Sequence, residues 1–181
     1  MPTLFLTVGL PGAGKTTLAR RMAEEHGALR PTPDEWMIPL FGESDAGGRR
    51  DVLEGRMLSF ALAALRLGTG VVLGFGCWSR AERSAIRRLA RSAGAACRLV
   101  YVPVDAETQR ARIARRQATA PDLTFPMTEA DLARWRELFE EPGTAELAGR
   151  VLDAPPPGWP GWREWAAERW PSFGSGRESG R

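Results

Sequence analysis

A glycine-rich segment near the start of the chain places one lysine and one hydroxyl at a fixed spacing. The segment reads Gly9-Leu10-Pro11-Gly12-Ala13-Gly14-Lys15-Thr16 and fits the pattern G-x-x-x-x-G-K-[ST]. In such a loop, glycines let backbone N–H groups turn inward around phosphate oxygens, the lysine reaches the outer phosphates, and the hydroxyl binds Mg²⁺. Residues 9–16, with Thr17 beside them, are therefore predicted to bind nucleotide phosphates, and Thr16 is predicted to bind the metal.

The segments on both sides of this loop suit the same role. Thr3–Val8 has the pattern of a short buried strand, and residues 15–25 have the pattern of an amphipathic helix. A helix N-terminus that follows a glycine turn attracts anions, because its free N–H groups and its dipole point the same way. Lys15 is also the only lysine of the chain. We therefore expect its ammonium to serve phosphate binding.

Strand and helix patterns alternate along the rest of the sequence. The segments expected to form strands are 3–8, 28–31, 71–76, 97–102 and 150–153. The helices that follow are expected to begin near residues 33, 49, 80, 106 and 129. This alternation is typical of a parallel sheet with helices on both faces. Ligands should then gather at the carboxyl ends of the strands.

Composition narrows the class of protein. A chain of 181 residues is long enough to form one domain without disulfides, and no apolar run is long enough to cross a membrane. Cys77 and Cys97 lie beside predicted strands and are expected to be small buried side chains in a reducing compartment. The net charge of +3 suits anionic ligands without requiring nucleic acid. A cytoplasmic location is expected.

The chain changes character after Ala154, where prolines and tryptophans become frequent. A short helix over residues 161–170 is expected to pack Trp162 and Trp165 against the domain. The alternative is a surface that binds a protein partner or stacks on bases. The expected division is a kinase-type domain over 1–153, an extension over 154–173 that packs on it, and a disordered tail over 174–181.

Three features together resemble a known group of enzymes. They are the phosphate-binding loop near residue 10, Asp34 just after the second predicted strand, and an arginine-rich helix after the fourth. The combination resembles the small P-loop kinases of the AAA-type ATP-binding family, a group that includes chloramphenicol phosphotransferase, tunicamycin-resistance proteins, zeta toxins and polynucleotide 5′-kinases. The resemblance covers about residues 1–153. It implies ATP-dependent phosphorylation of a hydroxyl.

The same resemblance implies a fold. It is an α/β, three-layer P-loop NTPase fold of the nucleotide-kinase type, with a five-stranded parallel sheet in the order 2-3-1-4-5. A helical lid is expected at about residues 109–127.

Phosphoryl transfer requires positioning, charge neutralisation and a group that deprotonates the attacking hydroxyl. Lys15, the loop amides and Mg²⁺ on Thr16 would hold the phosphates of ATP. Asp34 is the candidate base, because it follows the second predicted strand and matches an aspartate of the resembling kinases. The alternative is a carboxylate placed in a first helical turn by the helix dipole alone. A capping box between Thr32 and Glu35 is predicted to leave Asp34 available.

Arginines after the fourth strand are the candidates for the lid. Arg112 and Arg116 lie one helical turn apart and are predicted to stabilise the charge that develops during transfer, while Arg115 is predicted to contact the nucleotide. The alternative is a solvated basic helix. Arg80 and Arg83, after the third strand, are candidates for binding a substrate anion.

One position departs from the family pattern. Kinases of this type often carry a carboxylate at the end of the third strand, where it holds Mg²⁺ through water. Here that strand ends Leu73-Gly74-Phe75-Gly76 and has no acid. There are three explanations: either Asp34 supports the metal as well, or the glycines make room for substrate, or turnover has been lost.

Three functions therefore compete. The first is a kinase for a small hydroxyl compound, with a pocket wall formed by residues 36–41 and Trp78. The second is a polynucleotide 5′-hydroxyl kinase, which would need a basic groove that the scattered arginines do not obviously supply. The third is an ATP-dependent switch with little turnover and a protein partner on the tryptophan-rich tail. A dinucleotide-binding dehydrogenase is disfavoured, because that fold does not use the lysine of this loop.

Overall fold

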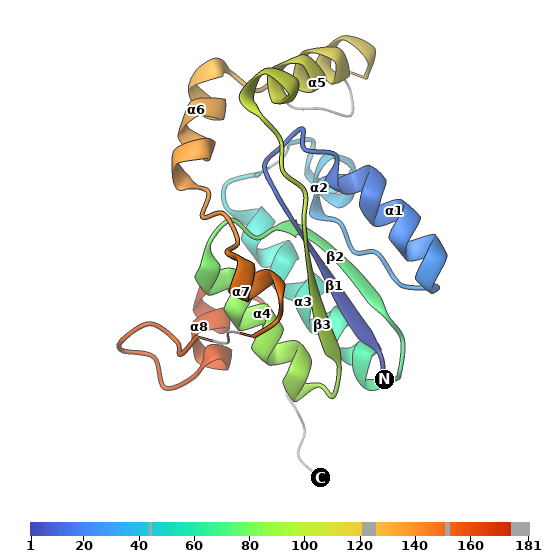
Figure 1. Cartoon of the computed structure of the whole chain (residues 1–181), viewed down its shortest axis with the longest axis vertical. Coiled ribbons are helices and arrows are strands. Elements are labelled where there is room, and N and C mark those ends of the chain that lie inside the picture. Colours follow the sequence, from blue (N-terminus) through green and yellow to red (C-terminus); the bar gives the residue numbers. More distant parts are fainter. Residues whose placement is uncertain (44, 121–125, 151–152, 175–181) are drawn as a thin grey trace.

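The computed structural model describes residues 1–43, 45–120, 126–150 and 153–174 (Figure 1). Its sheet consists of β1 (Thr3–Val8), β2 (Val71–Gly76) and β3 (Ala96–Tyr101), all parallel and in the order β2-β1-β3. The helices of the described residues are α1 (Lys15–His26), α2 (Pro33–Phe41), α3 (Arg49–Arg66), α4 (Arg80–Ser92), α5 (Ala106–Thr119), α6 (Glu129–Leu138), α7 (Thr144–Leu147) and α8 (Trp162–Arg169).

The sheet is smaller than the sequence predicted, although the order of its three strands is as expected. The predicted second strand forms only a single parallel bridge, between Leu29 and Val71 on the outer edge of β2. Pro31 lacks an N–H group and cannot donate to β2, so no regular ladder forms here, although its carbonyl oxygen accepts a hydrogen bond from the Gly74 N–H at 3.3 Å. The prediction of a full strand there is therefore wrong. The predicted fifth strand includes residues 151–152, which lie outside the described residues.

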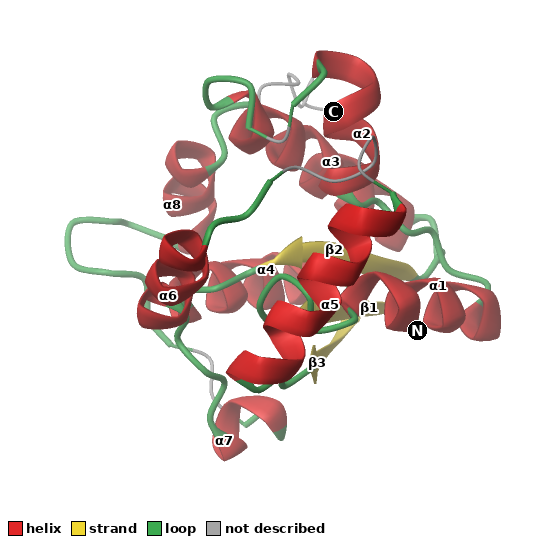
Figure 2. Cartoon of the chain, turned by 90° about the horizontal axis from the view of Figure 1, so that it is seen from above, coloured by secondary structure: helices red, strands yellow, loops and turns green. Residues whose placement is uncertain are grey.

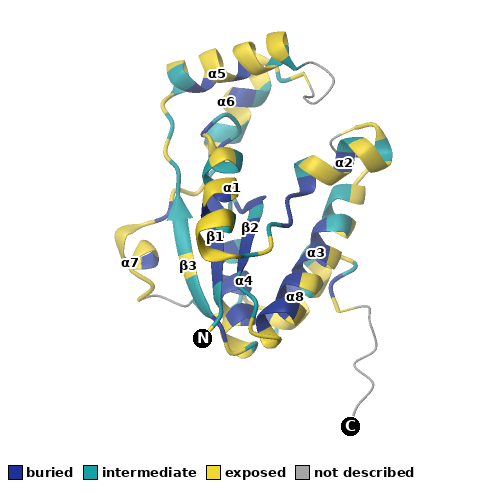
Figure 3. Ribbon diagram, turned by 90° about the vertical axis from the view of Figure 1, so that its right-hand side faces the viewer, coloured by how far each residue is buried: buried dark blue, intermediate teal, exposed yellow. Residues whose placement is uncertain are grey.

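The two faces of the sheet are covered by different helices. Along β1, the side chains of Leu4, Leu6 and Val8 pack into a core with α3, α4 and α8. Phe5 points to the other face, where it packs with residues of α1. This alternation follows from the two-residue period of a strand, and it explains why β1 is buried on both faces. In Figure 3 the buried residues of β1, β2 and α3 form the interior, whereas α5 is mostly exposed.

Helices α5 and α6 lie beyond the carboxyl ends of the strands (Figure 1), and α5 passes above them when the molecule is seen from that end (Figure 2). Side chains fix where these helices begin. Asp105 accepts a hydrogen bond from the backbone N–H of Thr108 at the start of α5. Thr128 and Asp131 form a capping box at the start of α6. The sequence therefore places the start of both helices correctly.

The C-terminal helix α8 packs against α4. Trp162 and Trp170 are buried in the core, and Trp165 packs at its edge. Gly55 of α3 permits a close approach, because a Cβ there would lie 3.0 Å from the carbonyl oxygen of Trp170. The tail tryptophans therefore contribute to the interior of the protein. No helix within the described ranges combines the length and the apolar character needed to span a membrane.

Arg83 and Arg80 are engaged by carboxylates of the chain, so their contacts give no support to the prediction that they bind a substrate anion. Arg83 is fully buried and donates two hydrogen bonds to Glu146, at 2.6 and 3.0 Å, and further ones to the carbonyl oxygens of Cys77 and Trp78. Arg80 donates two to Asp153. The pair Arg83–Glu146 fastens the segment after α6 to the start of α4.

Glu146→Ala is expected to reduce the free energy of unfolding by about 3–5 kcal/mol, because it leaves a buried guanidinium without its carboxylate. Denaturant-induced unfolding at equilibrium measures this loss. Glu129→Ala is the matched control, since Glu129 pairs with Arg110 in an exposed ion pair worth at most about 1 kcal/mol. Equal effects of the two variants would show that burial does not govern the Arg83–Glu146 pair.

Candidate active site

The phosphate-binding loop lies between β1 and α1, at the carboxyl edge of the sheet. Gly9 has a φ of 152°, and a Cβ there would lie 2.6 Å from the carbonyl oxygen of Val102. Gly12 has a φ of 79°, and a Cβ there would lie 3.1 Å from Ile113 of α5. These glycines thus let the loop pass closely beneath α5, where the side-chain amide of Gln109 donates to the carbonyl oxygen of Pro11 at 2.9 Å.

The ammonium of Lys15 lies over this loop. Its Nζ donates to the carbonyl oxygens of Gly9 and Leu10, at 2.8 and 2.9 Å. The pKa of Lys15 is lowered to about 8, chiefly by burial; Asp34 acts in the opposite direction, and the nearby charges of Arg50 and Arg116 contribute to the lowering. The site therefore holds a partly desolvated cation whose charge an incoming phosphate would stabilise.

Lys15 faces a cavity of about 890 Å³ that extends from the loop to the C-terminal helix. Its phosphate end is lined by Pro11, Gly12, Gly14, Lys15, Thr16, Thr17, Arg20, Arg112 and Arg116. Its opposite end, here called the acceptor end, is lined by Asp34, Asp45, Arg50, Asp51, Glu54, Trp78, Glu82, Trp135, Arg169 and Trp170. The cavity is large enough to hold a nucleotide and a second small molecule side by side.

Asp34 lies in the first turn of α2 and lines the cavity, half-buried, as expected of a residue after the second strand segment. The reason given for its availability is wrong. Thr32 makes no capping hydrogen bond, and Glu35 instead pairs with Arg20 and Arg30. Asp34 itself forms an ion pair with Arg50 of α3, with Oδ1 2.8 Å from the guanidinium.

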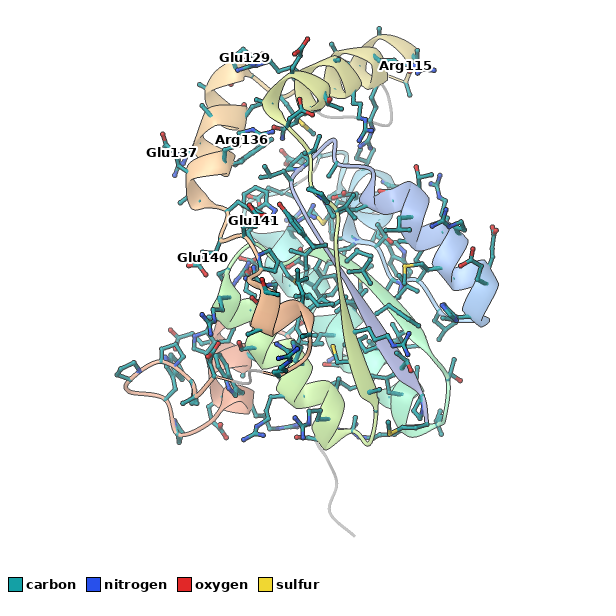
Figure 4. All side chains as sticks on the ribbon, viewed as in Figure 1. Arg115, Glu129, Arg136, Glu137, Glu140 and Glu141 are labelled. Atoms are coloured by element: carbon teal, nitrogen blue, oxygen red, sulfur yellow. The ribbon has the colours of Figure 1, made fainter. Side chains whose placement is uncertain are left out.

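The arginines of α5 differ in position. Arg112 donates to the carbonyl oxygen of Ala13 at 2.9 Å, and Arg116 also lines the cavity. Both therefore stand at the phosphate end. Arg115 is exposed and does not line the cavity, and Figure 4 shows it on the outer side of α5, away from the sheet. The contact of Arg115 with the nucleotide therefore stays a prediction, to which the cavity lining gives no support.

Gly74 at the end of β2 stands against Thr32, whose hydroxyl oxygen would lie 3.2 Å from a Cβ at this position. A carboxylate side chain would therefore crowd Thr32. Among the described residues, no group of three or more His, Cys, Asp or Glu side chains is arranged to hold a metal ion. Mg²⁺ in nucleotide enzymes is held mostly by phosphates and water, with one or two protein oxygens. Thr16, which lines the cavity beside Lys15, fits that arrangement.

Sequence reasoning missed several residues of the acceptor end. Arg50 and Glu54 lie four residues apart on α3, a spacing that could have indicated a pair. Arg169 reaches Asp51 and Glu82 from the far end of the chain, and no local pattern signals this. Trp135 of α6 lies 5.8 Å from Trp78 between ring centroids. Of the predicted pocket wall, Ile38, Pro39 and Trp78 line the cavity, whereas Trp36 is exposed and does not.

Comparison with known families agrees with this geometry. A family model described as "AAA domain" matches residues 4–142, which include the loop, Asp34 and all of α5. The chain belongs to this AAA family. The resemblance to its small P-loop kinases is thereby confirmed, and membership implies that the protein binds ATP. No curated protein matches the sequence.

Solved structures share the fold of this AAA protein at low sequence identity. A presumed kinase from Chloroflexus aurantiacus is 20% identical with a TM-score of 0.61, and the match covers 88% of this chain and 85% of that one. A chain of the Pnkp1/Rnl/Hen1 RNA repair complex is 18% identical with a TM-score of 0.65, over 82% of this chain and 45% of that one. A gluconokinase from Sinorhizobium meliloti is 16% identical with a TM-score of 0.52, over 94% and 90%.

Proposed function

We propose that the protein is a cytoplasmic, ATP-dependent kinase that transfers the γ-phosphate to a hydroxyl of a small molecule, which is a metabolite, nucleoside or antibiotic. One observation carries this proposal. The phosphate-binding lysine Lys15 and the carboxylate of Asp34 line one cavity of about 890 Å³, which is large enough for a nucleotide and an acceptor. The likeness of the fold to kinases adds support.

Residues at both ends of the cavity have roles in this reaction. The backbone amides of residues 12–16 and the ammonium of Lys15 bind the phosphates of ATP. Thr16 holds Mg²⁺, which when bound neutralises charge on the phosphates. Arg112 and Arg116 stabilise the charge that develops on the transferred group. Asp34 accepts the proton of the attacking hydroxyl.

The test is a screen of hydroxyl compounds with labelled ATP and Mg²⁺. It includes sugars, nucleosides, nucleoside-type and aminoglycoside antibiotics, and an oligonucleotide with a 5′-hydroxyl. A labelled small molecule supports the proposal, whereas label only on the oligonucleotide supports the polynucleotide kinase. ATP binding with no labelled product supports the third function, a switch.

The structure gives less support to the two alternatives. A polynucleotide kinase needs a basic path for the strand, but the α6 side of the molecule exposes Glu129, Glu137 and Glu140 (Figure 4). A switch that binds a partner through the tail tryptophans needs their rings on the surface. All four, Trp159, Trp162, Trp165 and Trp170, are buried or half-buried.

Acceptors with a negative group are expected to be poor substrates. Each arginine at the acceptor end is already held by two carboxylates, Arg50 by Asp34 and Glu54, and Arg169 by Asp51 and Glu82. A carboxylate or phosphate on the acceptor would meet these acids without a guanidinium to receive it.

We therefore expect kcat/KM to be at least about tenfold lower for a carboxylate-bearing analogue of an accepted compound than for its neutral parent. Steady-state kinetics on a series such as glucosamine, glucose and gluconate, or the corresponding analogues of the compound found in the screen, measures this ratio. A preference for the anionic analogue would show that Arg50 or Arg169 leaves its carboxylates to bind substrate.

A further inference from the structure

A continuous chain of polar contacts runs from the C-terminal helix to Asp34. The indole N–H of Trp170 donates to Glu54 Oε2 at 3.1 Å. Arg50 Nε donates to the other carboxylate oxygen of Glu54, also at 3.1 Å. The same guanidinium lies 2.8 Å from Oδ1 of Asp34. All four residues line the one cavity, although Trp170 and Asp34 are far apart in the sequence.

The Trp170 end of this series of contacts is held rigidly. Trp170 is 1% exposed, and Glu54 is 4% exposed. The absence of a side chain at Gly55 lets the backbone around Trp170 lie directly against α3. Ring contacts with Trp165, at 5.9 Å between centroids, fix the indole from the other side. The position of the indole N–H is therefore set by core packing and does not depend on a bound ligand.

In the middle of the series, the guanidinium of Arg50 lies between two acids. Arg50 is paired with Asp34 and with Glu54, so the two carboxylates lie on either side of one guanidinium. A carboxylate that is held through one oxygen keeps its second oxygen as a hydrogen-bond acceptor. Glu54 thus orients Asp34 through Arg50, and its negative charge offsets part of the positive potential that Arg50 produces at the base.

We propose that Trp170, Glu54 and Arg50 are positioning residues for Asp34, and that the C-terminal helix is thereby part of the catalytic apparatus. This inference rests on the proposed function, in which Asp34 is the base. It assigns a role in the reaction to a segment outside residues 4–142, the range that matches the AAA family.

The ionisation of Glu54 gives this series of contacts a measurable property. Burial raises the pKa of Glu54 to about 7, while Arg50, Arg169 of α8 and the Trp170 N–H lower it, and Glu82 of α4 raises it. Glu54 is thus charged above about pH 7 and neutral below. When Glu54 is neutral, its charge no longer offsets that of Arg50 beside Asp34, and we expect proton transfer from the hydroxyl to be slower.

Trp170→Phe tests the contact between Trp170 and Glu54, because phenylalanine fills much of the same space but donates no hydrogen bond. Without that donor the anion of Glu54 loses stabilisation, and its pKa is expected to rise by about one unit. In carboxyl ¹³C NMR, the signal of Asp34, assigned with Asp34→Asn, should show an inflection near pH 7 that moves upward by this amount. In transfer assays, kcat at pH 7 should fall several-fold and recover at higher pH, with KM for ATP unchanged.

Trp162→Phe is the matched control. Trp162 of α8 is also buried and also donates its indole N–H, at 2.9 Å to the carbonyl oxygen of Asp153, but it does not line the cavity. It should leave the inflection and kcat as in the wild type. Glu54→Gln, which preserves volume, should abolish the inflection even where Trp170→Phe folds poorly.

An inflection of the Asp34 signal at the same pH in Trp170→Phe and Trp162→Phe, or one that persists in Glu54→Gln, would overturn the inference. The NMR measurement needs no acceptor. Its outcome is therefore independent of the screen that tests the kinase function itself.

Discussion

Lys15→Ala is expected to weaken ATP binding by about two orders of magnitude and to remove detectable phosphoryl transfer. The ammonium lies over the loop and faces the phosphate end of the cavity. Charge-assisted hydrogen bonds to phosphate contribute about 1.5–3 kcal/mol each, and the alanine loses all of those made by Nζ. Isothermal titration calorimetry with ATP, followed by transfer assays at saturating ATP, measures both effects.

The same residue predicts a pH dependence. Because burial holds the pKa of Lys15 near 8 in the free protein, the ammonium is charged below this pH and increasingly neutral above it. ATP favours the charged form, so its apparent Kd should be about tenfold higher at pH 9 than at pH 7. The Lys15→Ala variant should lack this dependence.

Arg21→Ala provides the control on the same helix, since Arg21 lies on the solvent side of α1 in a surface pair with Glu25. It should bind ATP as the wild type does at both pH values. Tight binding of ATP by Lys15→Ala, with a pH dependence like that of the wild type, would refute the assignment of the loop as the phosphate site.

The phosphate-binding loop could be predicted because its requirements are local. Gly9 and Gly12 adopt positive φ angles and approach neighbouring backbone and side chains, so the fold demands glycine at those positions whatever the rest of the chain does. The strand before the loop and the helix after it follow from hydrophobic periodicity over a few residues. The order of the three central strands follows from the P-loop resemblance, and it too is observed.

The acceptor end could not be predicted in the same way, because it is formed by residues that lie far apart in the sequence. Glu35 was expected to cap α2, a local interaction, but two arginines from α1 and from the segment before α2 compete for it successfully. Arg169 meets Asp51 and Glu82 only after α8 has packed on α4. Contacts between distant segments thus engaged Arg169, whereas the local pair Arg50–Glu54 also formed.

Asp34→Asn should leave ATP affinity unchanged within about twofold and lower kcat for transfer by about 10²–10⁴-fold, the usual contribution of a general base. Asparagine occupies the same volume and can still accept a hydrogen bond from Arg50, but it cannot take up a proton. The separation of the two effects is the decisive feature. ATP affinity depends on the loop and Lys15, whereas kcat depends on the group that receives the proton of the hydroxyl.

Asp45→Asn is the matched control for this variant. Asp45 lines the same cavity, and its Oδ2 accepts a hydrogen bond from the backbone N–H of Gly48, which asparagine can preserve. It removes the same charge from the acceptor end without touching the base, so its kcat should stay close to that of the wild type. If Asp34→Asn transferred phosphate as fast as Asp45→Asn, the ion pair with Arg50 would be the whole role of Asp34. The attacking hydroxyl would then lose its proton directly to the phosphate, as a loose transition state permits, and the enzyme would act by positioning and charge alone.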